Sequence, residues 1–207
     1  MKKLSELFDT CLNIKYEQVG DKVNYAFKEE QDTLYIFFEC SNGIEDWRAN
    51  FDFKKQVYGL FKVHRGFYDC YYQARNIVLD KVYSKEWKQV IVVAYSHGSA
   101  LATICHQDIK YHFPNLDLKT YAFESPRVFK VSKQYLFYWE GLTRIEDNWD
   151  IVCHVPPKLF GFTDVGELIK IKGDTSLVKK KLPKCVKSHY QVVVMNGIEH
   201  FEQEKTQ

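Results

Sequence analysis

Residues 90–94 (VIVVA) form an unbroken apolar run that ends two positions before Ser96. Four of these five residues are β-branched, and such a run is typical of a strand that is buried on both of its faces. A strand of this kind needs a layer of structure on each side. The run therefore predicts the middle of a parallel sheet that is flanked by helices.

The segments around this run alternate between helical and strand-like patterns. Apolar residues recur at helical spacing over 66–83 and 98–111, and the short segments 119–123 and 143–146 are predicted to be strands. This alternation predicts an α/β fold with a mostly parallel central sheet, and the absence of a repeat or linker predicts one domain over 1–207. The other predicted elements are an amphipathic helix over 1–16, a strand hairpin at 23–27 and 33–39, a helix over 131–139, and a loop-rich remainder.

Composition excludes several classes of protein. A hydrophobic content of 45% with 27% charged residues excludes disorder, and a net charge of +2 gives no electrostatic reason to bind nucleic acid. No stretch approaches the roughly 20 apolar residues of a spanning helix, and the first residues do not resemble a secretory signal, so we expect a cytoplasmic protein. The six cysteines are widely spaced and are predicted to be buried thiols rather than zinc ligands or disulfides.

Ser96 has the local sequence of a nucleophile. A nucleophilic serine on a sharp turn between a strand and a helix needs small residues two positions before and after it, as in G-x-S-x-G. Ala94 and Gly98 occupy these positions, so alanine replaces the first glycine of the motif. The competing interpretation is that Ser96 only caps the helix that follows.

A nucleophilic serine needs a base, and the base needs an orienting carboxylate, which in this class follow the serine in the order acid, then histidine. Asp150 fits the acid because it follows a short strand and a polar turn. His189 is the better base because it lies in a polar loop ahead of an apolar segment, whereas His154 is only four residues beyond Asp150. His200, in the polar tail, is the second choice.

Five blocks of sequence follow one another in a recognisable order, at 38–41, 46–51, 63–67, 121–128 and 148–157. In turn they resemble the F-R-G-[ST], D-W-x-x-N, V-H-x-G-F, Y-x-F-G-x-P-R-V-G and N-x-x-D-x-V-x-x-x-P-P segments of the class 3 lipases, the fungal-type triacylglycerol lipase family. The resemblance spans about residues 33 to 195. It implies an α/β-hydrolase fold.

The same resemblance implies roles for individual residues. Ser96 would be the nucleophile, Asp150 the acid and His189 the base. The backbone N–H groups of Ser41 and His97 would form the oxyanion hole. Residues 42–51 match the lid region of the family, and Trp47 and Phe51 would lie on it as substrate-binding residues.

Three positions depart from the family pattern. Glu39 and Cys40 replace the Arg and Gly of the first block, and cysteine does not adopt positive φ as easily as glycine. His97 stands where these lipases usually have leucine, and either contacts substrate or contributes only its backbone. Glu124 replaces the glycine of Y-x-F-G, and either places a carboxylate near the site or is a solvated loop residue, which is the interpretation adopted.

These features predict a serine carboxylic-ester hydrolase, a lipase or esterase that acts on lipid or small acyl esters without a metal or other cofactor. The alternatives are a phospholipase, thioesterase or acyltransferase with the same triad, or a non-catalytic module on this fold. A metalloprotein is a further alternative, with candidate ligands at His64, His97, His106, His112 and His154. The lysines of 179–184 form either a solvated loop or a transient contact with a membrane or lipid surface. No oligomeric state is indicated.

Overall fold

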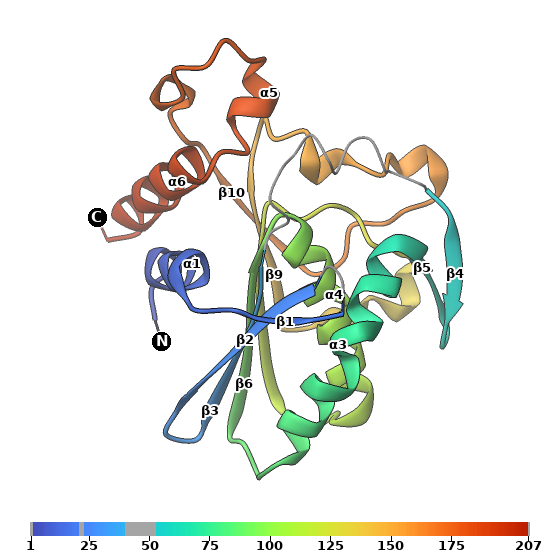
Figure 1. Cartoon of the computed structure of the whole chain (residues 1–207). Helices are drawn as coiled ribbons and strands as arrows, with labels where there is room; N and C mark the ends of the chain where they lie inside the picture. The colour runs from blue at the N-terminus through green and yellow to red at the C-terminus, as the bar shows by residue number, and fades with distance from the viewer. Residues whose placement is uncertain (1, 21–22, 40–52, 207) are drawn as a thin grey trace.

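A seven-stranded sheet runs through the molecule in the order β1-β2-β3-β6-β7-β9-β10 (Figure 1). The computed structural model describes residues 2–20, 23–39 and 53–206. The last five strands of this order are mutually parallel, whereas β2 and β1 are antiparallel additions at one edge. The strands are β1 (Glu17–Val19), β2 (Val23–Glu30), β3 (Thr33–Phe38), β6 (Gln89–Tyr95), β7 (Asp117–Phe123), β9 (Leu142–Asp147) and β10 (Glu167–Ile171).

The strand β6 lies inside the sheet, between β3 and β7, and this position explains its unbroken apolar sequence. Its side chains alternate between two separate hydrophobic clusters. Val90, Val92 and Ala94 belong to one cluster, and Ile91 and Val93 belong to the other. Because successive side chains of a strand point to opposite faces, a strand covered on both sides has no position for a polar residue.

Helices cover both faces of the sheet. On one face lie α3 (Arg65–Tyr83) and α4 (His97–His112), which pack against each other and against the sheet. On the other face lie α1 (Leu4–Asn13) and α6 (Gln191–Glu204), also in mutual contact (Figure 1). None of the helices in the described part of the chain is long and apolar enough to cross a membrane.

The remaining elements are short. A second, antiparallel sheet has the strand order β4-β5-β8 and lies beside α3. Its strands are β4 (Lys55–Tyr58), β5 (Phe61–His64) and β8 (Phe129–Lys130). The short helices are η1 (Lys133–Trp139), η2 (Val152–His154), η3 (Lys158–Phe160), η4 (Thr175–Leu177) and α5 (Lys184–Lys187).

The predicted α/β fold with a mostly parallel sheet is confirmed, as are the hairpin β2–β3, the strand β6 and the helices α3 and α4. The helix predicted over 131–139 is also present, as the 3₁₀ helix η1, which begins at Lys133. The loop-rich remainder also contains the edge strand β10 and the 14-residue helix α6, which the sequence patterns did not predict. The edge strand buries only Ile171, so its pattern is too weak to read.

The cysteine prediction was correct in part. Cys11, Cys105 and Cys153 are buried. Cys70 and Cys185 are only half-buried, so for these two the prediction was wrong. Both lie on helices, α3 and α5, that have one face toward solvent. Cys40 lies outside the described residues.

Candidate active site

Ser96 occupies the sharp turn between β6 and α4. Its backbone has φ of 57° and ψ of −122°, a conformation that costs a residue other than glycine free energy. The turn is held because the Ser96 N–H donates to the carbonyl of Phe123 on β7 over 2.8 Å. The serine therefore stands at the carboxyl end of the parallel strands, where sites of such sheets form.

The residues after Ser96 allow α4 to begin close to the sheet. A Cβ atom on Gly98 would lie 2.5 Å from the carbonyl oxygen of Phe38 and 2.9 Å from that of Glu39, so only glycine fits. The hydroxyl of Ser99 lies 2.8 Å from each of two strand carbonyls, those of Ala94 and Phe123. The motif therefore needs glycine at position 98 because β3 comes so close to it. At position 94, the other small position of the motif, Ala94 is fully buried and its methyl group fits.

The structure brings Ser96, His189 and Asp150 together. The Oγ atom of Ser96 lies 2.7 Å from Nε2 of His189, and Nδ1 of His189 is in short hydrogen-bonding contact with Oδ2 of Asp150. The other oxygen of Asp150 accepts from the N–H of Val152 over 2.8 Å. All three side chains are buried, and 6% of Ser96 is exposed. The serine hydroxyl, imidazole and carboxylate thus form a connected relay.

His189 is also held from its other side. The ring of Tyr95 stacks on the imidazole with centroids 5.2 Å apart, and its hydroxyl donates to the backbone carbonyl of His189. Sequence reasoning did not assign Tyr95 a role. The available signal was its position directly before the nucleophile, which places it on the face of β6 opposite to Ala94.

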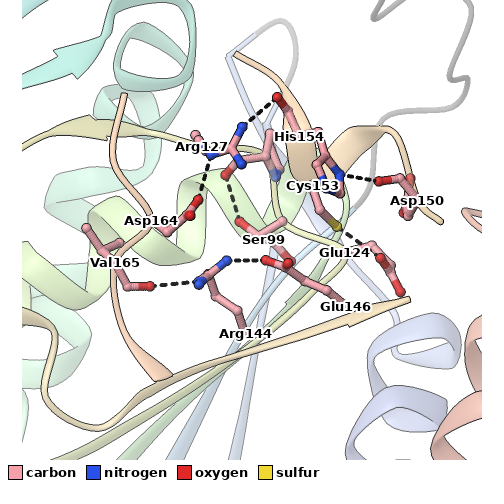
Figure 2. A network of polar contacts seen from close by, with 12 residues as sticks. Ser99, Glu124, Arg127, Arg144, Glu146, Asp150, Cys153, His154, Asp164 and Val165 are labelled. Carbon is pink, nitrogen blue, oxygen red and sulfur yellow. Dashed lines mark hydrogen bonds and ion pairs between the residues drawn. The ribbon is translucent and has the colours of Figure 1, made fainter. Parts of the chain in front are cut away.

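Glu124 was also missed, because it was interpreted as solvated. It follows β7, is fully buried, and has φ of 49°. Its Oε1 accepts from the N–H of Asp147 over 2.8 Å, and its Oε2 accepts from the thiol of Cys153 over 3.0 Å (Figure 2). Burial, and next the charge of Asp150, raise the pKa of Glu124 well above its usual range.

Of the two predicted oxyanion donors, the structure describes one. His97 begins α4, so its backbone N–H lies at the helix N-terminus beside Ser96. Its ring packs edge-on against Phe67 at 5.5 Å, and burial lowers the pKa of His97 to about 4. The ring is therefore neutral at neutral pH and is not a cationic proton donor to a substrate. Ser41, Trp47 and Phe51 lie outside the described residues.

The other histidine candidates lie elsewhere. His154 is exposed and has Nδ1 2.8 Å from the backbone oxygen of Asp150, and His200 is exposed on α6. Among the described residues, the side chains that could jointly hold a metal ion are Glu124, Asp150 and Cys153, a group without any histidine. The five-histidine metal site considered from the sequence is therefore wrong for the described part of the chain.

Exposed apolar side chains recur along the segment 149–160, which begins beside Asp150. Trp149 and Ile151 flank the acid, and Leu159, which is 92% exposed, follows on η3 with Phe160. These four residues are called the apolar rim. Two ion pairs of Asp164 fasten this region: its carboxylate binds the guanidinium of Arg127 at 2.6 Å, drawn in Figure 2, and the ammonium of Lys158 at 2.5 Å.

Ser96 has a positive φ and directly follows a central parallel strand, and His189 links its hydroxyl to the buried carboxylate of Asp150. This arrangement defines the α/β-hydrolase class. The chain belongs more narrowly to the family described as "Lipase (class 3)", whose family model matches residues 35–160. The resemblance drawn from the five sequence blocks is thereby confirmed. His189 lies beyond the matched segment, so its place in the site comes from the structure.

Relatives in sequence and structure agree with this family. The lipase of Rhizopus oryzae is 33% identical over 175 residues, which are 78% of this chain and 44% of that protein. The lipase of Rhizomucor miehei is 32% identical over 151 residues, 67% of this chain and 42% of that protein. This chain therefore spans less than half the length of these relatives.

Solved structures show the same fold. The triacylglyceride lipase of Rhizomucor miehei superposes with a TM-score of 0.70 and 23% identity, covering 92% of this chain and 84% of that one. A triacylglycerol lipase described as having a serine protease triad at its catalytic centre superposes with a TM-score of 0.66 and 26% identity. That match covers 90% of this chain and 81% of the other.

Proposed function

We propose that this protein hydrolyses carboxylic esters with Ser96 as nucleophile, His189 as general base and Asp150 as the orienting acid. The observation that carries the proposal is the 2.7 Å contact between Ser96 Oγ and His189 Nε2, at a strained turn above a parallel sheet. The triad named for a similar triacylglycerol lipase supports the same chemistry.

The proposed reaction has two halves. His189 Nε2 takes the proton of Ser96 as Oγ attacks the ester carbonyl carbon, and the tetrahedral oxyanion is stabilised by the N–H of His97 together with that of Ser41. His189 then gives this proton to the departing alcohol, which leaves an acyl group on Ser96. Water, activated by His189, releases the acid and restores the serine. Asp150 stabilises the imidazolium in both halves.

The substrate we propose is an ester with an apolar acyl chain. The apolar rim of Trp149, Ile151, Leu159 and Phe160 supports this class, because exposed apolar side chains gathered near a site favour contact with an acyl chain or lipid surface. The ammonium of Lys184 lies 4.1 Å from the ring centroid of Trp149, next to the exposed lysines 179–181. These cations support a transient contact with an anionic lipid surface.

The proposal is tested with p-nitrophenyl esters from acetate to palmitate. Ser96→Ala should lower kcat by about 10⁶-fold, as for other triads, while the far-UV CD spectrum stays unchanged. Ser132→Ala is the matched control, because Ser132 is exposed and lies directly before η1, which contributes no residue to the relay. An optimum at long acyl chains would support the lipid class, and an optimum at acetate would favour small esters.

A second pair of variants tests the base. His189→Ala should abolish turnover, whereas His200→Ala should retain it because His200 is exposed on α6. An organophosphonate ester should add one phosphonyl group to the wild type, located on Ser96 by mass spectrometry. Turnover that survives in folded Ser96→Ala, or the absence of turnover and of labelling in the wild type, would contradict the proposal.

A further inference from the structure

Two carboxyl groups lie side by side beneath His189. Oxygens of Glu124 and Asp150, together with the sulfur of Cys153, lie within 4.8 Å of one another, and all three side chains are buried. Two buried carboxylates this close would repel each other, so the proximity favours a state in which one of them carries a proton. A hydrogen bond can form between the two carboxyls only in that state, since two carboxylates only accept.

The surroundings determine which carboxyl carries the proton. Asp150 faces His189, which becomes a cation during the reaction, and it also accepts from the backbone N–H of Val152. Glu124 faces Asp150, the thiol of Cys153 and the backbone N–H of Asp147. Among the described residues no lysine or arginine forms an ion pair with Glu124. The negative charge is therefore better placed on Asp150.

We propose that Glu124 is a positioning residue of this site: as a neutral carboxylic acid it donates its proton to the Asp150 carboxylate and holds that carboxylate against His189. The proton stays between the two carboxyls, so Glu124 neither takes part in acyl transfer nor touches the substrate. This inference rests on the proposed hydrolase function for its catalytic meaning. The resulting chain of hydrogen bonds runs from Cys153 through Glu124 and Asp150 to His189 and Ser96.

The backbone at Glu124 supports a selected role for this side chain. Its φ of 49° lies in the left-handed region, where glycine is favoured and where the family pattern has glycine. Glutamate at this position therefore accepts both backbone strain and burial of a carboxyl group. Its contacts satisfy both oxygens, and burial, together with the neighbouring carboxyls, raises the pKa of the Cys153 thiol, which stays a donor.

The kinetic test compares two variants over pH. Glu124→Gly relieves the backbone and removes the donor, whereas Glu124→Gln stays neutral and retains a donor toward Asp150. Without the donor, the charge of Asp150 is no longer partly neutralised by a hydrogen bond, so it stabilises the imidazolium of His189 more. The acid limb, which is the fall of kcat/KM at low pH, should therefore move up by about one pH unit in Glu124→Gly. That variant should also lose about tenfold in kcat/KM, and Glu124→Gln should restore the acid limb and part of the rate.

The opposite charge state predicts the opposite sign. If Glu124 were an anion, both variants would remove a negative charge beside the relay, and the acid limb would move to lower pH in both. That result would overturn the proposal. Equal acid limbs in all three proteins would overturn it as well, because Glu124 would then only fill space. Glu140→Gln, on an exposed glutamate, is the control for a change of net charge.

A second measurement is independent of activity. If Glu124 folds with its proton, the unfolded chain releases that proton above its ordinary pKa, so the wild type should lose thermal stability relative to Glu124→Gln as pH rises from about 5 to 8. A constant difference in Tm over this range would overturn the protonated state. If esters are not turned over but the difference in Tm grows, the proposed function fails while the shared proton remains.

Discussion

Replacing Gly98 by alanine should disturb the site more than the fold. The added Cβ would lie 2.5 Å from the Phe38 carbonyl oxygen, about 0.9 Å short of the 3.4 Å at which ordinary contact begins. The oxygen belongs to the backbone and the position of the Cβ is fixed by the backbone of α4, so either the end of β3 or the first turn of α4 must move. We expect a loss of about 1–3 kcal/mol in the free energy of unfolding from overpacking. A displacement approaching 1 Å beside Ser96 should lower kcat/KM by about 10²-fold.

Gly66→Ala is the matched control for this change. Gly66 also lies in the first turn of a helix, α3, but its Cβ would meet only the ring of His64 at 3.4 Å, an ordinary contact. Alanine there should leave stability equal or raise it by up to about 1 kcal/mol. Urea unfolding and p-nitrophenyl ester turnover measure both effects. Unchanged stability and turnover in Gly98→Ala, or equal losses in the two variants, would refute the argument from close approach.

Two further predictions concern pH and the apolar rim. Burial lowers the pKa of His106 to about 3, so the stability that it contributes is present above about pH 6.5 and is lost as pH falls toward 3, by up to about 1.4 kcal/mol per pH unit. His106→Gln should therefore flatten the decline in urea-unfolding free energy between pH 6.5 and 4.5, whereas the exposed His200→Gln should show the wild-type slope. Leu159→Asp should lower turnover of emulsified triacylglycerol by about tenfold or more through loss of one apolar contact, with stability changed by less than about 0.5 kcal/mol. Leu60 lies in the turn between β4 and β5 and is 67% exposed, so Leu60→Asp should leave that turnover unchanged. Equal effects of Leu159→Asp and Leu60→Asp would contradict a role for the apolar rim.

The central part of the fold could be read from local patterns because its elements are strongly periodic. Residues 90–94 of β6 include no polar side chain, and α3 and α4 have clear helical spacing, so burial on both faces of a sheet followed directly. The C-terminal region was harder. The edge strand β10 buries one residue, and α6 follows a short stretch of lysines and a proline that resembles loop.

The three residues of the proposed triad could be selected from sequence for a chemical reason. Each had to satisfy a requirement on its type and its order along the chain, and the turn around Ser96 needs small neighbours. His97 was harder to interpret, because its burial and contact with Phe67 depend on α3, which is distant in sequence. Tyr95 and Glu124 had no motif of their own to identify them.

Strand, helix and nucleophile were encoded locally, in hydrophobic periodicity and in the size of the residues beside Ser96. The protonation state of the site residues was not encoded locally, because it depends on which groups lie in contact after folding. In the sequence Glu124 resembles a solvated residue. In the folded protein it is fully buried, and β7 and the segment of Asp150 place it beside a second carboxyl and a thiol. Proximity and the removal of water, which no short stretch of sequence records, turn that glutamate into a neutral partner of the acid.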